Sequence, residues 1–253
     1  MSRLFAALLC LWAIFCGRAL AEPLVVSSDS TRTLPEGRIE TGVFQPVRYG
    51  LHDGLELSSH ILMLVNPQLQ AKWRFFERGR YSSAAVGRLS YPKPLLDLLA
   101  GEGALGLLPE DSRVPQVLVL DMDALATAEW MPEQLLTLSA GISVAPRGSA
   151  EGMPLLDFPF LYARFAVLKT TAVYRAGLGY EAMLGARFRL AADVKLFFLP
   201  VVDGGFSLEP GLSLRWLLAE HVALEAGARF EYARYPPGMQ FHYLPFIDAL
   251  FAW

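Results

Sequence analysis

Four histidines beyond the first 21 residues are the side chains best suited to acid–base chemistry. His60 follows two serines, and a Ser–His pair can form a nucleophile when a third group orients the histidine. However, its spacing matches no such motif, and His242 has neither a serine nor an acid at a suitable distance in sequence. His52 and His221 lie in predicted turns. The histidines therefore do not predict a catalytic site.

Asp121 and Asp123 form a second candidate group, because alternate residues of a strand lie on the same face. Two carboxylates could attract a cation. The many arginines of the chain favour ion pairing instead, and the sequence contains no Gly-rich phosphate loop and no cluster with metal-ligand spacing. We therefore expect no catalytic, metal or cofactor site.

The two cysteines, Cys10 and Cys16, lie in an N-terminal segment that resembles an export signal. Arg3 precedes an apolar run that is too short to span a bilayer as a helix, and Ala19-Leu20-Ala21 supplies the small residues required for cleavage. We expect a Sec-type signal peptide over residues 1–21. The mature chain would then have no cysteine and no disulfide.

A lipoprotein acylated at Cys16 is the alternative to cleavage before Glu22. The large side chain of Phe15 and the presence of Ala13, where leucine is usual, disfavour this alternative.

Charge and hydropathy narrow the class of protein further. Removal of Arg3 and Arg18 with the signal changes the net charge from −3 to −5, and no basic patch for nucleic acid is evident. The mean hydropathy of +0.34 is high, yet no run of 18 apolar residues follows the signal. Only helices and closed barrels satisfy the backbone within lipid, so this combination favours a membrane β-barrel.

Apolar and polar residues alternate with period two through most of the mature chain, which is typical of strands that are half exposed to lipid. Residues 206–216, 222–232 and 243–253 show the pattern clearly. We count about 13 such segments, including one around Arg164. Because single-chain bacterial barrels usually have an even number of strands, we predict an all-β antiparallel barrel of 12 strands, with 10 to 14 allowed, over residues 37–253.

The connections between these segments carry further expectations. Short turns are predicted at 52–54, 190–194 and 219–221, on the periplasmic side. The polar residues 22–36 could be a mobile tail or contain a short strand. The loop 92–115 is unusually rich in leucine, and we interpret it as an outer loop with a short helix at the rim, the alternative being a plug. Tyrosine and tryptophan near the strand ends favour an interfacial belt over simple β-propensity.

The polar faces place eleven acids and eleven bases toward the interior. A selective pore would favour one sign of charge, so the balance predicts ion pairs and a filled or narrow lumen. The main candidates for the lumen are Arg48, Glu56, Lys72, Arg74, Asp121, Asp123, Arg164, Arg175, Arg187, Arg189, Glu209, Arg215, Glu225, Arg229 and Glu231. The remaining members are Glu40, Arg88, Glu129, Glu181, Asp193, Lys195 and Asp248.

The last strand, with Phe251 and the terminal aromatic Trp253, resembles the signal that bacterial outer-membrane barrels present to the barrel-assembly machinery. Leu34-Pro35-Glu36-Gly37, Phe44-Gln45-Pro46-Val47-Arg48-Tyr49-Gly50-Leu51 and Ser90-Tyr91-Pro92-Lys93-Pro94-Leu95-Leu96 are similar to an uncharacterised family of exported barrels. The resemblance implies an outer-membrane location, contact with membrane lipid and assistance by that machinery. It implies no activity.

Three hypotheses for function follow. The preferred one is a narrow channel or transporter for small solutes or lipid-like molecules. The second is a structural or interaction barrel with a filled, salt-bridged lumen that works through its outer loops, and the third is a lipid-modifying enzyme. A soluble periplasmic β-sandwich is the alternative to the barrel itself. The sequence predicts neither the solute nor the oligomeric state.

Overall fold

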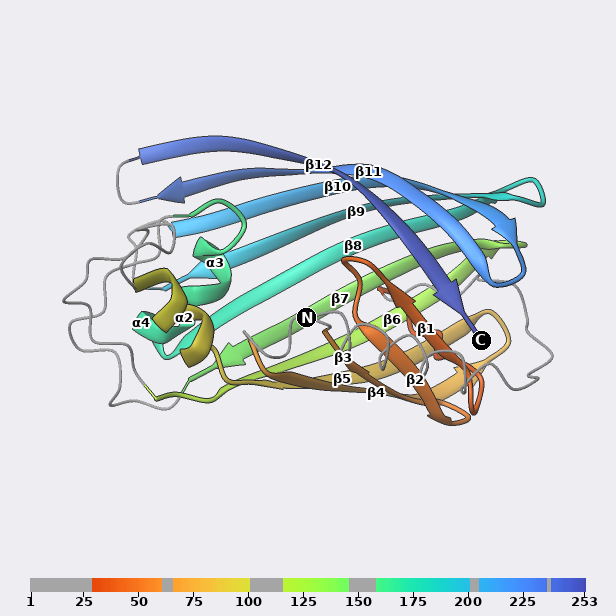
Figure 1. Cartoon of the computed structure of the whole chain (residues 1–253), viewed down its shortest axis with the longest axis horizontal. Helices are drawn as coiled ribbons and strands as arrows, with labels where there is room; N and C mark the ends of the chain where they lie inside the picture. The colour runs from red at the N-terminus through yellow and green to blue at the C-terminus, as the bar shows by residue number, and fades with distance from the viewer. Residues whose placement is uncertain (1–28, 61–65, 101–115, 146–157, 201–204, 236–237) are drawn as a thin grey trace, which may run out of the picture.

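The computed structural model describes residues 29–60, 66–100, 116–145, 158–200, 205–235 and 238–253. Twelve antiparallel strands form one closed barrel, in which each strand pairs with its neighbours in sequence and β1 pairs with β12 (Figure 1). The predicted fold class and strand number are confirmed. The strands are β1 (Ile39–Gly42), β2 (Val47–His52), β3 (Leu55–Ser59), β4 (Gln68–Arg78), β5 (Tyr81–Ser90), β6 (Val119–Met131), β7 (Gln134–Val144), β8 (Ala172–Leu184), β9 (Phe188–Leu199), β10 (Gly205–Ala219), β11 (Val222–Tyr235) and β12 (Gly238–Ala252).

The two ends of the barrel differ. At one end, short turns join β2 to β3, β4 to β5, β6 to β7, β8 to β9 and β10 to β11, and the C-terminus lies at the same end. The helices α2 (Lys93–Ala100), α3 (Tyr162–Phe165) and α4 (Val167–Thr170) lie at the opposite end (Figure 1). None of the described helices is long and apolar enough to cross a membrane.

Alternation along the strands sorts apolar side chains to the outside and polar ones to the inside. On the outer face, Ile247 of β12 is 73% exposed and Leu212 of β10 is 53% exposed. On the inner face, Glu209 and Glu231 are fully buried. This inversion of the usual soluble pattern is characteristic of barrels that face lipid.

Backbone hydrogen bonds of the terminal residue close the barrel. Ile39 N–H donates to the carbonyl of Trp253, and Trp253 N–H donates back to Ile39, at 2.9 and 3.0 Å. The β1–β12 register continues only to Gly42, which is opposite Leu250. Closure therefore rests on a short ladder at the short-turn end.

Two local expectations were wrong. Residues 190–194 are not a turn but part of β9, because Ala191 and Asp193 continue the inward face; the turn lies at 185–187, where Gly185 has a φ of +71°. The segment around Arg164 is helical, not a strand. Tyr162 and Ala163 of the first short helix and Val167 and Leu168 of the second are buried, so the segment packs as helix and not as an alternating strand.

Candidate functional site: the barrel lumen

The N-terminal segment 29–36 lies inside the barrel, in the half next to the short turns, and Ser30, Thr31 and Leu34 are completely buried. Residues 29–36 form no strand and are mostly buried, whereas residues 22–28 of the predicted tail lie outside the described part of the chain. The turn at Gly37, with a φ of +79°, returns the chain from the lumen to β1. Gly50 makes room for this path, because a Cβ at position 50 would lie 1.9 Å from the carbonyl oxygen of Pro35.

Lumen side chains hold this segment through its backbone. The Lys72 ammonium donates to the carbonyls of Ser30 and Arg32, both at 3.1 Å. Glu56 Oε2 accepts the N–H of Leu34 at 3.1 Å. Thr31 N–H donates to Thr127 Oγ1, also at 3.1 Å. Polar contacts of this kind can be exchanged for water, so the segment is a polar insert and not part of an apolar core.

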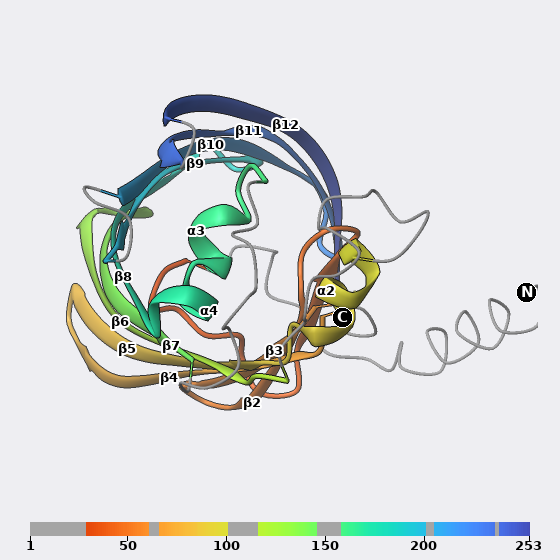
Figure 2. The ribbon, with the colours of Figure 1, turned by 90° about the vertical axis from the view of Figure 1, so that its left-hand side faces the viewer.

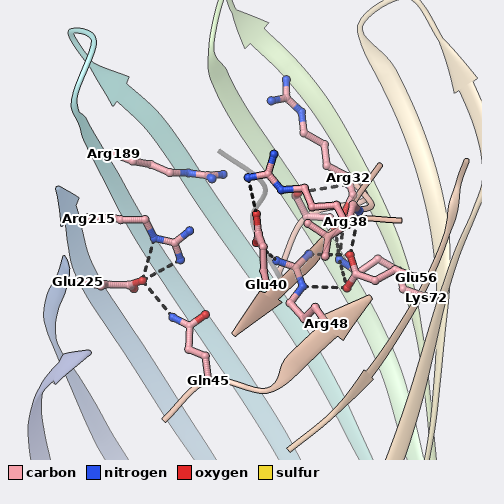
Figure 3. Close-up of polar contacts among 12 residues, drawn as sticks. Arg32, Arg38, Glu40, Gln45, Arg48, Glu56, Lys72, Arg189, Arg215 and Glu225 are labelled. Atoms are coloured by element: carbon pink, nitrogen blue, oxygen red, sulfur yellow. Dashed lines mark hydrogen bonds and ion pairs between the residues drawn. The ribbon is translucent and has the colours of Figure 1, made fainter. Parts of the chain in front are cut away.

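A buried chain of charges lies beside the segment. Arg48 donates to both Glu56 oxygens at 2.9 and 2.7 Å and to Glu40 at 3.2 Å, and Glu40 also pairs with Arg38 at 3.1 Å (Figure 3). Partner removal from such a pair leaves an uncompensated buried charge. Arg48 of β2, placed between Glu40 of β1 and Glu56 of β3, therefore holds the three strands together.

A second network runs along the inner wall and joins β5, β6 and β8. Arg175 donates to both oxygens of Asp123 at 2.5 and 2.7 Å and to Asp121 at 3.1 Å. Arg88 donates to the other oxygen of Asp121 at 2.8 Å. A Cβ at Gly141 would lie 1.9 Å from Asp123 Oδ1, so the glycine leaves space for this carboxylate. The sequence favoured ion pairing for the two aspartates, and they are ion-paired here.

The inner faces of β8 to β11 carry further pairs. Arg215 and Gln45 both donate to Glu225 Oε2, at 2.8 and 3.0 Å, which connects β10 and β11 to the β1–β2 turn (Figure 3). Arg229 donates to Asp193 at 3.2 Å, and Arg189 donates to Glu181. Near them, Lys195 pairs with Asp29 at 3.5 Å. This last contact ties the described start of the N-terminal segment to β9.

The opposite half of the lumen is filled by α3 and α4, which lie within the ring of strands (Figure 2). Tyr162 stacks on Tyr235 of β11, with the ring centroids 4.5 Å apart, and Val167 packs in the same core cluster. Leu96 and Leu99 of α2 join this cluster, so the described part of the 92–115 loop contains the expected short helix; residues 101–115 lie outside the described part.

Two buried glutamates anchor α3 to the wall. Glu209 of β10 accepts two hydrogen bonds from Arg164, at 2.8 and 2.7 Å. Glu231 of β11 accepts the N–H of Phe160 at 2.7 Å and the hydroxyl of Tyr235 at 2.8 Å. Arg164 thus lies inside the barrel, as predicted, but on a helix, from which it points to the wall.

Most of the predicted lumen charges lie on the inner wall; Arg164 lies on α3, and Arg187 and Arg74 lie at the short-turn end. Arg187 is exposed in the turn before β9. Arg74 lies near the end of β4 and pairs with the exposed turn residue Asp53 at 2.9 Å, next to a register shift that ends the regular alternation. Sequence reasoning missed Asp29, Arg38 and Gln45, because all three lie outside the alternating strands.

The histidines make structural contacts. His60 Nε2–H donates to the carbonyl of Phe44 at 2.8 Å, and His242 Nε2 lies 2.9 Å from Gln240 Oε1. Within the described part of the chain, no three His, Cys, Asp or Glu side chains are grouped so as to hold a metal ion.

Among the cavities between the described residues, two in the lumen are lined by the ion-paired side chains. One, of about 360 Å³, lies next to α3 and α4 and is lined in part by Arg88, Asp121 and Arg175. The other, of about 810 Å³, is lined by Arg189, Arg215 and Glu225. Both reach Asp29 and Lys195, so they meet at the ion pair that holds the N-terminal segment.

These features define the class of protein: a closed antiparallel barrel of the outer-membrane type, with an apolar exterior and an ion-paired, partly filled interior. No protein-family model and no curated protein matches the chain.

Solved structures that are similar include outer-membrane proteins. The KdgM porin in complex with disordered oligogalacturonate has 7% identity, a TM-score of 0.47, and coverage of 85% of this chain and 96% of that one. OmpT of Vibrio cholerae has 10% identity and a TM-score of 0.47, over 83% of this chain and 65% of its own. The CymD monoaromatic hydrocarbon channel has 10% identity and a TM-score of 0.39, over 94% and 95%. The likeness concerns the barrel architecture only.

Proposed function

We propose that the chain is an integral outer-membrane barrel that acts as a narrow channel or transporter for small solutes or lipid-like molecules. The carrying observation is that two cavities meet at the Asp29–Lys195 pair, beside a segment held mainly by exchangeable polar contacts. A shift of residues 29–36 would join these cavities to the short-turn end. In this state the segment keeps that end closed.

The apolar exterior supports the membrane location, since 12 antiparallel strands with outward leucine, isoleucine and tyrosine match the lipid-facing surface of such barrels. Membrane fractionation and heat-dependent migration on a gel test it. A folded barrel in the outer-membrane fraction is expected, and recovery solely in the soluble fraction would overturn the location.

Conductance in planar bilayers tests the channel. In Lys72→Met the two hydrogen bonds to the carbonyls of Ser30 and Arg32 are lost while the side chain stays long, so openings should be more frequent than in the wild type. Lys93→Met is the matched control, because Lys93 pairs with Asp97 on α2, away from the segment. Absence of conductance in all three folded proteins would reject the channel.

A second candidate is the structural or interaction barrel. It is favoured by the apolar packing of α3 and α4, in which Tyr162 and Val167 are each only 1% exposed. A barrel whose lumen is closed at that end by an apolar core, and which shows no conductance in bilayers, would act through its outer loops.

A further inference from the structure

In the part of the chain that the structure describes, most of β12 has no partner strand on its β1 side. Strand β12 has 15 residues, whereas β1 has four and pairs only with residues 250–253. In the described parts of the chain, no strand pairs with residues 238–248 on that side. Figure 1 shows the short β1–β3 at one end and β12 running much farther. We call this interruption, between residues 238–248 and the Val43–Pro46 turn, the side gap.

Specific side-chain hydrogen bonds order the edge of the side gap next to the β1–β2 turn. Asp248 Oδ1 accepts the N–H groups of Val43 and Phe44 at 2.8 and 3.2 Å, so a side chain ends the β1–β12 ladder. His60 binds the carbonyl of Phe44 from the other side. Pro245 lies within the part of β12 that borders the gap, and proline suits a strand edge because it has no N–H to leave unpaired.

The side gap communicates with the lumen. The 810 Å³ cavity is bounded by Leu244–Asp248 and Phe44–Pro46 on one side and by Arg215, Glu225 and Arg229 on the other. An unpaired strand edge at membrane depth is tolerated only where it is buried in protein or lines a water-filled cavity. This edge of β12 borders the 810 Å³ cavity, whose lining is rich in charged residues.

Part of the side gap lies at the depth of the hydrocarbon. About 9–11 tilted residues of a strand cross a bilayer, so the 15 residues of β12 are more than enough to span it. Tyr243 and Ile247, on the outer face of this stretch, are 68% and 73% exposed. Residues 242–248 of the gap edge therefore face lipid on their outer side.

The chemistry of the cavity indicates what could occupy it. Its lining contains four bases, Arg189, Lys195, Arg215 and Arg229, and five acids, Asp29, Glu181, Asp193, Glu225 and Asp248. Nearly balanced charge suits a headgroup that carries both signs. Leu244 and Phe246, on the inner face of β12 at the gap, are apolar and suit the start of an acyl chain.

We propose that the side gap admits a zwitterionic membrane amphiphile, with its headgroup in the 810 Å³ cavity and its acyl chain in the bilayer. The proposal rests on the transport function above and gives it a substrate class and a path. Because α3–α4 fill one end of the lumen and residues 29–36 the other, lateral passage requires neither to leave.

Quenching by lipids with a nitroxide on the acyl chain tests the gap. A fluorophore is attached to a single cysteine in the barrel, in protein with Cys10 and Cys16 changed to serine, folded in vesicles of zwitterionic phosphatidylcholine. Leu244→Cys reports the gap, Leu212→Cys the outer face of a fully paired strand, and Ser139→Cys the inner face of another. Quenching at position 244 should be comparable to that at 212 and well above that at 139. Quenching at 244 no stronger than at 139 would overturn the proposal.

Lipid selectivity tests the headgroup. Spin-labelled phosphatidylcholine should show an immobilised component that Leu244→Trp reduces and the matched outer substitution Leu212→Trp does not. A preference for anionic phosphatidylglycerol, or equal effects of the two substitutions, would contradict the assignment. Ion conductance is recorded on the same samples: conductance without quenching at 244 rejects the side gap alone, and quenching without conductance rejects the channel alone.

Discussion

The carbonyl oxygen of Pro35 occupies the space that a side chain at Gly50 would need, at 1.9 Å from the position of its Cβ. Gly37 N–H also donates to the carbonyl of Gly50 at 2.8 Å. One glycine of β2 thus decides whether residues 29–36 can lie in the lumen.

Gly50→Ala should therefore displace the N-terminal segment. We expect a Thr31→Cys reporter, buried in the parent, to react faster with a water-soluble maleimide when Gly50→Ala is present. Gly87→Ala is the control, because its Cβ would meet nothing within 4 Å. Equal reaction rates in the two backgrounds would show that the segment does not depend on this close approach.

Replacement of Arg164 should destabilise the barrel through Glu209, which is fully buried and loses two hydrogen bonds. We expect Arg164→Met to lower the free energy of unfolding by about 1–3 kcal/mol, measured by urea titration in micelles. Adding Glu209→Gln should recover part of the loss, because the uncompensated charge is removed. Simple additivity of the two substitutions would refute this coupling.

Tyr162→Ala should loosen the α3–α4 end. Truncation of a buried aromatic side chain costs about 3–5 kcal/mol, and here the stacking on Tyr235 is also lost. Larger or more frequent conductance steps should accompany the lower stability in planar bilayers. Phe158→Ala, at a half-exposed position before α3, should change neither quantity.

Trp253→Ala should impair assembly in cells while the barrel still folds in lipid vesicles. The closing hydrogen bonds use the backbone of Trp253, so removal of its side chain leaves them possible. The proportion of heat-modifiable protein in outer membranes should fall, whereas spontaneous folding in vesicles should not. Trp253→Phe should restore assembly; an equal loss in vesicles would assign Trp253 a purely structural role.

Which side chains of the barrel wall face inward and which face outward could largely be predicted from the alternation of apolar and polar residues in the sequence. The sorting of Leu212 outward and Glu209 inward was readable because side-chain direction in a strand is a local property. The same reasoning failed around Arg164, where a short segment was compatible with either period and packing against Tyr235 decided for a helix. It failed again at residues 190–194, where a run of small residues looked like a turn.

The sequence alone indicated the class of the protein: alternation and high hydropathy without a membrane helix predicted a closed membrane barrel, and the balance of inward charge predicted an ion-paired interior. Only the tertiary structure decided what fills and interrupts that barrel. The burial of residues 29–36, the helices inside the ring and the short β1 depend on contacts between residues far apart in the chain, such as Asp29 with Lys195 and Val43 with Asp248. Such long-range contacts leave no periodic trace, because periodicity records only the direction of neighbouring side chains.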